Sequence, residues 1–199
     1  MVGKGASKSA QRTASNIIDA AVALMVDQNS RDVEMSHVAK AAGVSRTTLY
    51  RHFPTRAALL EGIFDDTMEA YRLGMQAALA ARPAVEDRIT AVVEFVEAWL
   101  QEGRLLKTYR IDAALMLKLT DRIMPTAVEI FLVSMEPVFK IAEIVNGAPL
   151  DRRTIAQMFV HYSTSLILFP PQAPRYKPAR LMGQLIHALL RMPPELAAR

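Results

Sequence analysis

The sequence predicts an all-α protein, and three observations support that fold class. Apolar residues recur at intervals of three and four along most of the chain, as they do on one face of a helix. No segment alternates strictly between apolar and polar residues, which is the pattern typical of strands. Helix-breaking residues separate the periodic segments, most clearly at Gly103, at Asn146-Gly147 and among the four prolines between 170 and 178.

Two helices are predicted before the first sharp turn. The first spans about 10–28, and Asn29 follows it at a position where asparagine tolerates the left-handed backbone of a helix end. The second spans about 35–42. Its capping position holds Glu34, which is a poorer N-cap than the short side chains of serine, threonine, aspartate or asparagine.

A third, short helix is predicted over 46–52, directly after a tight turn. Gly43 can take the positive φ that such a turn requires, and Ser45 can cap the next helix by accepting a backbone N–H. Pro54 disfavours helical geometry at Phe53 and therefore ends this helix. The segment is polar except at Leu49, so it suits insertion into a DNA major groove as the recognition helix of a helix-turn-helix. An ordinary helical hairpin with a solvated face is the alternative.

The remainder of the chain is predicted to be helical as well, giving about nine helices in all. Thr55 caps a long fourth helix that runs to about Ala81, a length of about 40 Å at 1.5 Å per residue. Gly62 and Gly74 within it mark places of close packing or easy bending, and Pro137 is expected to kink a later helix. Further helices are predicted over 85–102, 104–119, 122–145, 152–168 and 178–191.

The net positive charge of the chain lies in its first 60 residues. The whole sequence carries 24 Lys+Arg and 20 Asp+Glu, of which the first 60 residues hold 8 basic and 4 acidic. The rest of the chain therefore has 16 residues of each sign. A basic module attached to a neutral one indicates phosphate attraction at one end of the molecule.

The segment S-R-T-T-L-Y-R-H-F-P-T-R-A-A-L-L, residues 45–60, resembles the DNA-binding domain of TetR-family transcriptional repressors nearly position for position. The resemblance covers about residues 12–62, and beyond it the chain is similar to the family only in length and helical character. It implies an N-terminal arm and helix-turn-helix domain over 1–54. It also implies a helical ligand-binding and dimerisation domain over 55–199, joined through the long fourth helix.

Specific DNA contacts can be predicted from side-chain chemistry and from the matching family positions. Arg46 can bond a guanine bidentately, and Thr47 can reach base edges or phosphates. The matching family positions make Tyr50 and His52 phosphate contacts. Arg56 matches a position that is usually lysine and that clamps a phosphate. The complete predicted DNA-binding set is Ser36, Ser45, Arg46, Thr47, Thr48, Tyr50, Arg51, His52 and Arg56, whereas Leu49 and Phe53 are predicted to be core.

The second domain is expected to bind a small-molecule effector and to form a homodimer on a palindromic double-stranded DNA operator. The helices of this domain are rich in methionine and aromatic residues, whose side chains pack adaptably and can line an apolar pocket. A solid core is an equally good interpretation of the same residues. The predicted pocket residues are Phe64, Met68, Tyr71, Trp99, Tyr109, Asp112, Met116, Phe131 and Met135. The two C-terminal helices have apolar residues around most of their circumference, which favours burial against a partner. The predicted dimer interface comprises Phe159, Tyr162, Leu166, Leu181, Leu185 and Leu189.

Other function classes lack support in the sequence. The chain has no cysteine, no phosphate-binding glycine loop and no hydrolase or metalloprotease motif, and its four histidines are scattered. No enzyme activity, cofactor or metal site is therefore expected. No run of about 18 apolar residues occurs, so we expect a cytoplasmic protein without a membrane partner. The main alternative function is a DNA-binding architectural protein without a small-molecule effector.

Overall fold

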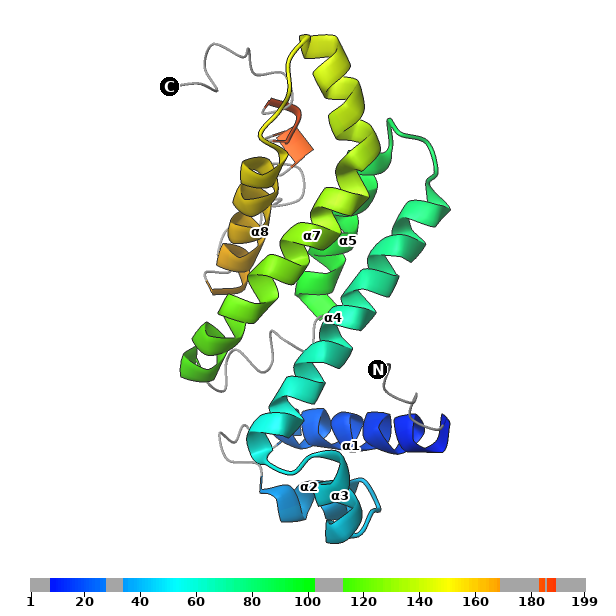
Figure 1. The fold of residues 1–199 in the computed structure, drawn as a ribbon, viewed down its shortest axis with the longest axis vertical. Helices are drawn as coiled ribbons and strands as arrows, with labels where there is room; N and C mark the ends of the chain where they lie inside the picture. The colour runs from blue at the N-terminus through cyan, green and yellow to red at the C-terminus, as the bar shows by residue number, and fades with distance from the viewer. Residues whose placement is uncertain (1–7, 28–33, 103–112, 169–182, 185, 189–199) are drawn as a thin grey trace, which may run out of the picture.

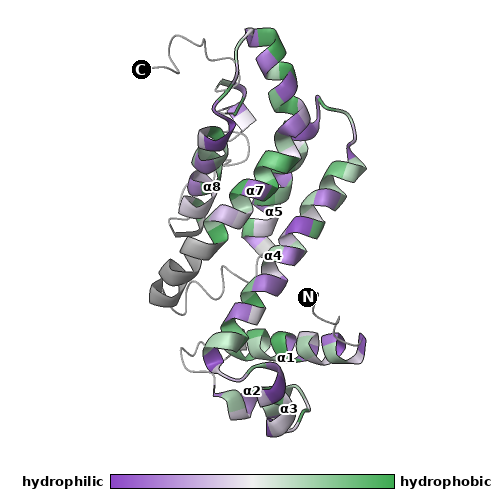
Figure 2. Ribbon diagram, viewed as in Figure 1, coloured by the Kyte–Doolittle hydropathy of each residue, from purple (hydrophilic) through white to green (hydrophobic). Residues whose placement is uncertain are grey.

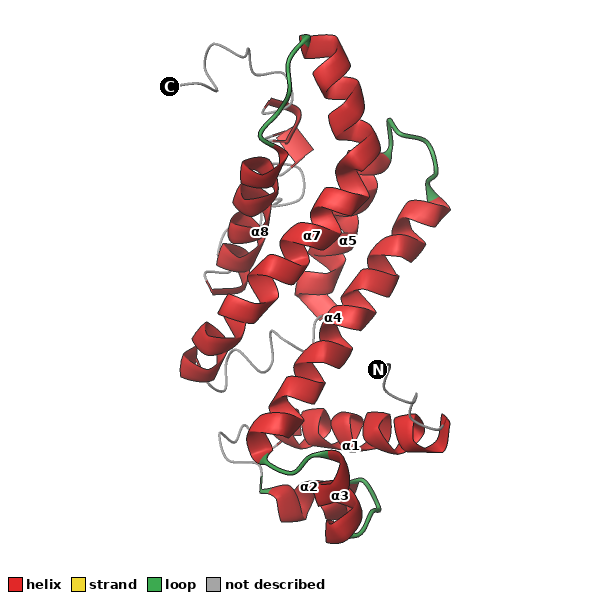
Figure 3. Cartoon of the chain, viewed as in Figure 1, coloured by secondary structure: helices red, strands yellow, loops and turns green. Residues whose placement is uncertain are grey.

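The computed structural model describes residues 8–27, 34–102, 113–168, 183–184 and 186–188 (Figure 1). Within these residues every regular element is a helix, which confirms the all-α prediction (Figure 3). None of the described helices is long and apolar enough to cross a membrane. The helices are α1 (Lys8–Asp27), α2 (Met35–Ala41), α3 (Arg46–His52), α4 (Arg56–Ala81), α5 (Arg88–Glu102), α7 (Ala113–Asn146) and α8 (Arg152–Leu168).

Local sequence signals account for most helix ends. Gly43 has a φ of +65° in the turn between α2 and α3, and Gly147 has a φ of +67° just after α7. Ser45 and Thr55 cap α3 and α4, each accepting a backbone N–H three residues on at 3.0 Å. Asp151 caps α8 in the same way, through a 3.0 Å bond from the Thr154 N–H. The caps at Ser45 and Thr55 were predicted from the sequence.

One long helix replaces part of two predicted ones. The break expected between the segments 104–119 and 122–145 does not occur, because α7 runs without interruption from Ala113 to Asn146. Pro125 lies inside this helix instead of at its start, and its neighbours include no glycine that would end the helix. Pro137 also lies inside α7, and Figure 1 shows the helix changing direction along its upper half. The expected helix over 178–191 lies mostly outside the described residues.

The apolar faces of the helices form two separate cores. Figure 2 shows hydrophobic and hydrophilic residues alternating along the helices, as expected where one face is buried. The first core joins α1, α2 and α3 to Leu59 in the first turn of α4. The second core joins Phe64, Met68 and Met75 of α4 to α5, α7 and α8. The domain boundary predicted between residues 54 and 55 stays a prediction, because α4 contributes residues to both cores.

Two glycines let aromatic rings pack directly against α4. A Cβ atom built at Gly62 would lie 2.6 Å from Cε1 of Phe53, the residue that ends α3. A Cβ atom at Gly74 would lie 2.7 Å from Cε2 of Phe95 on α5. Both distances are far shorter than carbon contacts allow. Close packing, one of the two roles predicted for these glycines, is therefore confirmed, and it fixes α4 against Phe53 and against α5.

Ion pairs hold α8 against α7. The Arg152 guanidinium donates from Nε to Oε1 of Glu143 at 2.8 Å and from Nη1 to Oε2 of Glu136 at 2.6 Å. The Leu150 N–H donates to the same Glu143 oxygen at 3.1 Å. The bond from Arg152 and then that from Leu150 lower the pKa of Glu143 to about 2. The ionised carboxylate therefore closes the turn between the two helices.

Acid should weaken the contact that Glu143 makes with Arg152 and Leu150 between α7 and α8. Because the folded-state pKa lies below the usual value of 4.5, ionised Glu143 stabilises the fold above pH 4.5, and this contribution is lost as the pH falls toward 2. We expect the melting temperature, followed by circular dichroism, to fall more steeply over this range in the natural protein than in Glu143→Gln. Asp66→Asn, which removes an exposed carboxylate of α4, is the control. Its melting temperature should fall with pH as steeply as that of the natural protein. Identical slopes for the natural protein and Glu143→Gln would contradict this role.

Candidate DNA-binding surface and ligand cavity

The third helix has one buried side and one exposed side. Leu49 is completely buried in the first core, and Phe53 is buried at the end of the helix, as predicted. Arg46, Thr47 and Arg51 are exposed, and 48% of the Tyr50 surface is accessible although the residue is large and aromatic. Guanidinium, hydroxyl and phenol groups are therefore presented together on a short helix, as a recognition helix requires.

Some predicted DNA-binding hydroxyls already have partners in the protein. Ser45 accepts the Thr48 N–H, and the hydroxyls of Ser45 and Thr48 lie 2.9 Å apart. These two residues thus build the start of α3. The Ser36 hydroxyl donates to the Glu34 carboxylate at 3.1 Å. A hydroxyl has a single proton, so Ser36 would have to leave Glu34 before it could donate to a phosphate.

The remaining predicted contacts flank α3. His52 is half-buried, and its ring centroid lies 6.4 Å from that of Phe53. Arg56 is exposed in the first turn of α4, directly after the Thr55 cap. Glu34 makes no side-chain hydrogen bond to the start of α2, which confirms that it is a poor cap. The structure therefore brings all nine predicted DNA-binding residues to the helix-turn-helix and the adjoining end of α4.

Asn16 is a positioning residue that the sequence interpretation missed. Its side-chain amide donates from α1 to the carbonyl oxygen of Ala42 at 2.7 Å. Ala42 ends α2, where carbonyl groups lack partners within the helix. The bond therefore ties α1 to the turn that sets the direction of α3. Because 26 residues separate the two groups, no local pattern could reveal it.

A cavity of about 60 Å³ lies between α4, α5, α7 and α8. Of the predicted pocket residues, Met68, Tyr71 and Trp99 line it, whereas Phe64, Phe131 and Met135 are buried in the surrounding core. Tyr109, Asp112 and the side chain of Met116 lie outside the described residues. The other lining residues are Val96, Leu100, Ile123, Ala127, Phe159, Val160, Ser163 and Thr164.

An aromatic cluster forms one wall of this cavity and extends behind it. The ring of Tyr71 lies 5.3 Å from those of both Phe95 and Trp99, and the last two rings are 5.9 Å apart. Burial raises the pKa of the Tyr71 phenol well above its usual value of 10, so this group remains a hydrogen-bond donor at neutral pH. Phe95 also presses against Gly74, so the cluster connects the cavity to α4.

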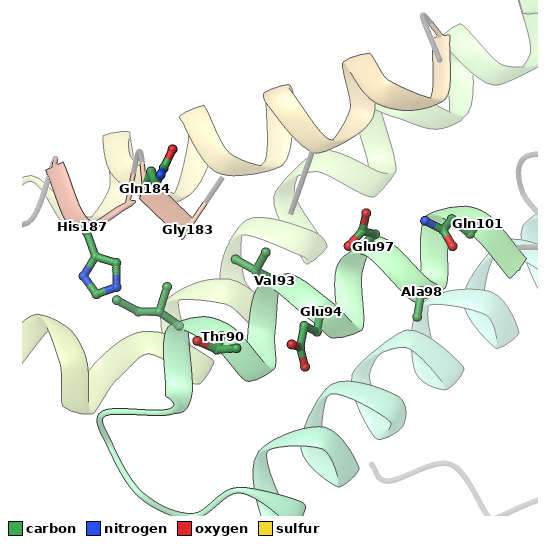
Figure 4. Close-up of a pocket in the computed structure, with 10 residues that line it drawn as sticks. Thr90, Val93, Glu94, Glu97, Ala98, Gln101, Gly183, Gln184 and His187 are labelled. Atoms are coloured by element: carbon green, nitrogen blue, oxygen red, sulfur yellow. The ribbon is translucent and has the colours of Figure 1, made fainter. Parts of the chain in front are cut away.

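A wider groove runs along the outer side of α5 (Figure 4). It has a volume of about 710 Å³ and separates α5 from residues Gly183, Gln184 and His187. Its α5 side presents polar groups over an apolar base that includes Val93. None of the predicted pocket residues lines this groove.

The predicted dimer residues have different environments. Phe159 is buried in the second core, where its ring stacks on that of Phe131 with centroids 4.3 Å apart, and its place in a dimer interface stays a prediction. Tyr162 and Leu166 are half-buried, and Leu181, Leu185 and Leu189 lie outside the described residues. Met158, which is 52% exposed, is the large apolar residue that α8 presents to solvent among the residues described. Helix α8 is apolar around so much of its circumference that its pattern could not identify the inward face.

Comparisons with known proteins agree with this geometry. The family model for bacterial regulatory proteins of the tetR family matches residues 17–63. The chain is 31% identical to the uncharacterized HTH-type transcriptional regulator Rv1255c of Mycobacterium tuberculosis over 169 residues, 81% of this chain and 79% of that protein. It is 30% identical to the HTH-type transcriptional repressor KstR2 of Rhodococcus jostii over 95 residues, 46% of each chain.

Two solved structures share the fold. The TetR family repressor AlkX from a Dietzia strain aligns with a TM-score of 0.59 at 22% identity, over 92% of this chain and 97% of that one. The transcriptional regulator FadR from Bacillus subtilis, solved in complex with stearoyl-CoA, aligns with a TM-score of 0.61 at 18% identity. That alignment covers 88% of this chain and 97% of FadR.

The bond from Asn16 to Ala42 can be tested with Asn16→Leu, which is close in size and cannot donate, and Asn16→Asp, which sets a carboxylate against a carbonyl oxygen. Losing this bond should weaken binding to a specific DNA duplex about 5- to 10-fold, while binding to random duplex stays unchanged. Fluorescence anisotropy measures both affinities. Gln11→Glu adds the same charge at an exposed position of α1 and is the control for Asn16→Asp. Natural affinity of Asn16→Leu for the specific duplex would refute the positioning role.

Proposed function

The chain belongs to the tetR family of bacterial regulatory proteins, and we propose that it is a repressor released from its operator by a small apolar or amphipathic effector. Membership of this family makes it a DNA-binding transcriptional regulator and not an enzyme. In the proposed function a homodimer binds a palindromic operator. The observation that carries this proposal is the third helix, which buries Leu49 and exposes Arg46, Thr47, Tyr50 and Arg51.

Each exposed side chain has a proposed role on the operator. Arg46 donates to a guanine, and Thr47 contacts neighbouring base edges. Tyr50, His52 and Arg56 contact phosphates and set the register of the protein on the duplex. Two recognition helices in a homodimer would read half-sites about 34–36 Å apart, one turn of DNA.

The proposed switch works through α4. An effector must widen the cavity of about 60 Å³, and Tyr71 and Trp99 must then move relative to Phe95. Since Phe95 presses on Gly74, this movement shifts α4, and the contact of Gly62 with Phe53 carries the shift to α3. A change in the separation of the recognition helices would weaken operator binding. A coupling of about 1–3 kcal/mol corresponds to roughly 5- to 150-fold.

Selection of bound duplexes from a random pool tests DNA recognition. We expect the natural protein to select a palindrome and Arg46→Ala to lose at least about 30-fold in affinity for it, because the homodimer loses two bidentate base contacts worth about 1–3 kcal/mol each. Lys140→Ala removes one exposed positive charge of α7 and is the matched control. A pool that yields no motif, together with natural affinity for Arg46→Ala, would favour the architectural alternative.

Homodimerisation through α8 can be tested at Met158. Met158→Glu places a charge on the exposed face of α8, so we expect the sedimentation equilibrium to shift from dimer to monomer, with a parallel loss of operator affinity. Val133→Glu makes a comparable change on α7, where Val133 is 73% exposed. This control should remain dimeric. A stable Met158→Glu dimer would show that the exposed face of α8 is not the contact surface.

A further inference from the structure

We propose that the cavity between α4, α5, α7 and α8 takes an uncharged, largely apolar molecule that carries a hydrogen-bond acceptor, such as an ester, a ketone or an ether. This inference deepens the proposed function, since it names the chemical class of the effector. It depends on the cavity alone, so binding can be measured without DNA.

The walls of the cavity favour an apolar occupant. Met68, Val96, Leu100, Ile123 and Ala127 contribute hydrocarbon and thioether surface from three helices, and Phe159 and Val160 add more from α8. No charged residue is among the described lining residues. An ion transferred from water into such surroundings without a partner loses several kcal/mol of hydration, on the order of the whole affinity of a small ligand. A charged head group is therefore disfavoured.

The polar groups of the cavity favour an acceptor on the ligand. Ser163 and Thr164 donate their hydroxyl protons to the carbonyl oxygens of Phe159 and Val160, at 2.8 and 2.9 Å. Their protons are thus already used within α8. The Tyr71 hydroxyl and the Trp99 indole N–H are donors, and neither has a hydrogen-bond partner among the described residues. A carbonyl or ether oxygen can accept from these donors without bringing a charge.

The size of the cavity requires it to open on binding. A volume of about 60 Å³ is far below the roughly 300–1,000 Å³ of typical ligand pockets. Met68 is flexible, and the Tyr71, Phe95 and Trp99 rings meet each other in tilted and edge-on contacts that can rearrange. A flexible chain with a single acceptor fits such a site better than a rigid ring system.

Three molecules with a twelve-carbon chain distinguish an uncharged ligand from an anionic and from a cationic one. Methyl dodecanoate is uncharged, dodecanoate is an anion at neutral pH, and dodecyltrimethylammonium is a cation. Trp99 is the sole tryptophan of the chain and lines the cavity, so its fluorescence reports binding directly. We expect the ester, titrated below its solubility limit, to bind at least about ten-fold more tightly than either ion, titrated below its micelle concentration. Equal or tighter binding of an ion, or no binding of the ester, would overturn the proposal.

Tyr71→Phe tests the hydrogen bond without changing the shape of the cavity. This variant should bind methyl dodecanoate about five-fold more weakly and dodecane with unchanged affinity, since dodecane has no acceptor. Unchanged ester binding by Tyr71→Phe, together with equal affinities of the natural protein for the ester and for dodecane, would overturn the acceptor requirement. Operator release is measured separately by anisotropy. If the ester binds and the operator stays bound, the ligand class stands and the proposed switch fails.

Discussion

The contact between Phe53 and Gly62 connects the DNA-binding module to the rest of the molecule. Phe53 ends the recognition helix, and its ring lies where any side chain at position 62 would have to be. The recognition helix is therefore packed directly on α4, and the orientation of α4 determines the orientation of the exposed side chains of α3. A second close contact, of Phe95 with Gly74, fixes α4 to α5 in the second core about three turns further along. One helix thus has a tightly packed site in each core.

The elements with strong local signals were predictable from the sequence. The bounds of α3 follow from Gly43, Ser45 and Pro54, and the long α4 follows from its Thr55 cap and the lack of a breaker before Arg82. Eight of the nine predicted DNA-binding residues, all except Ser36, could be named because the segment after Gly43 is similar to a known family position by position. Their individual contacts with DNA stay predictions.

Other features depend on tertiary packing, which the sequence does not reveal. Phe159 was predicted for the dimer interface because α8 is apolar on more than one side, and only its stacking on Phe131 identifies the inward face. Phe64, Phe131 and Met135 have the same chemical character as true lining residues, so composition could not separate core from cavity. The continuity of α7 was missed because Pro125 is compatible with the first turn of a new helix as well as with a helix interior.

The small volume of the cavity has a consequence, under the proposed function, for how sensitively the protein would respond to an effector. When the form that accepts a ligand is rarely populated, the apparent dissociation constant rises in inverse proportion to that population. Traces of a suitable metabolite would then leave the gene silent, and transcription would begin only after the compound had accumulated. Under the proposed function, looser packing around Trp99 would lower this threshold and make the response less selective, and the density of the unliganded core would set the dose at which transcription begins.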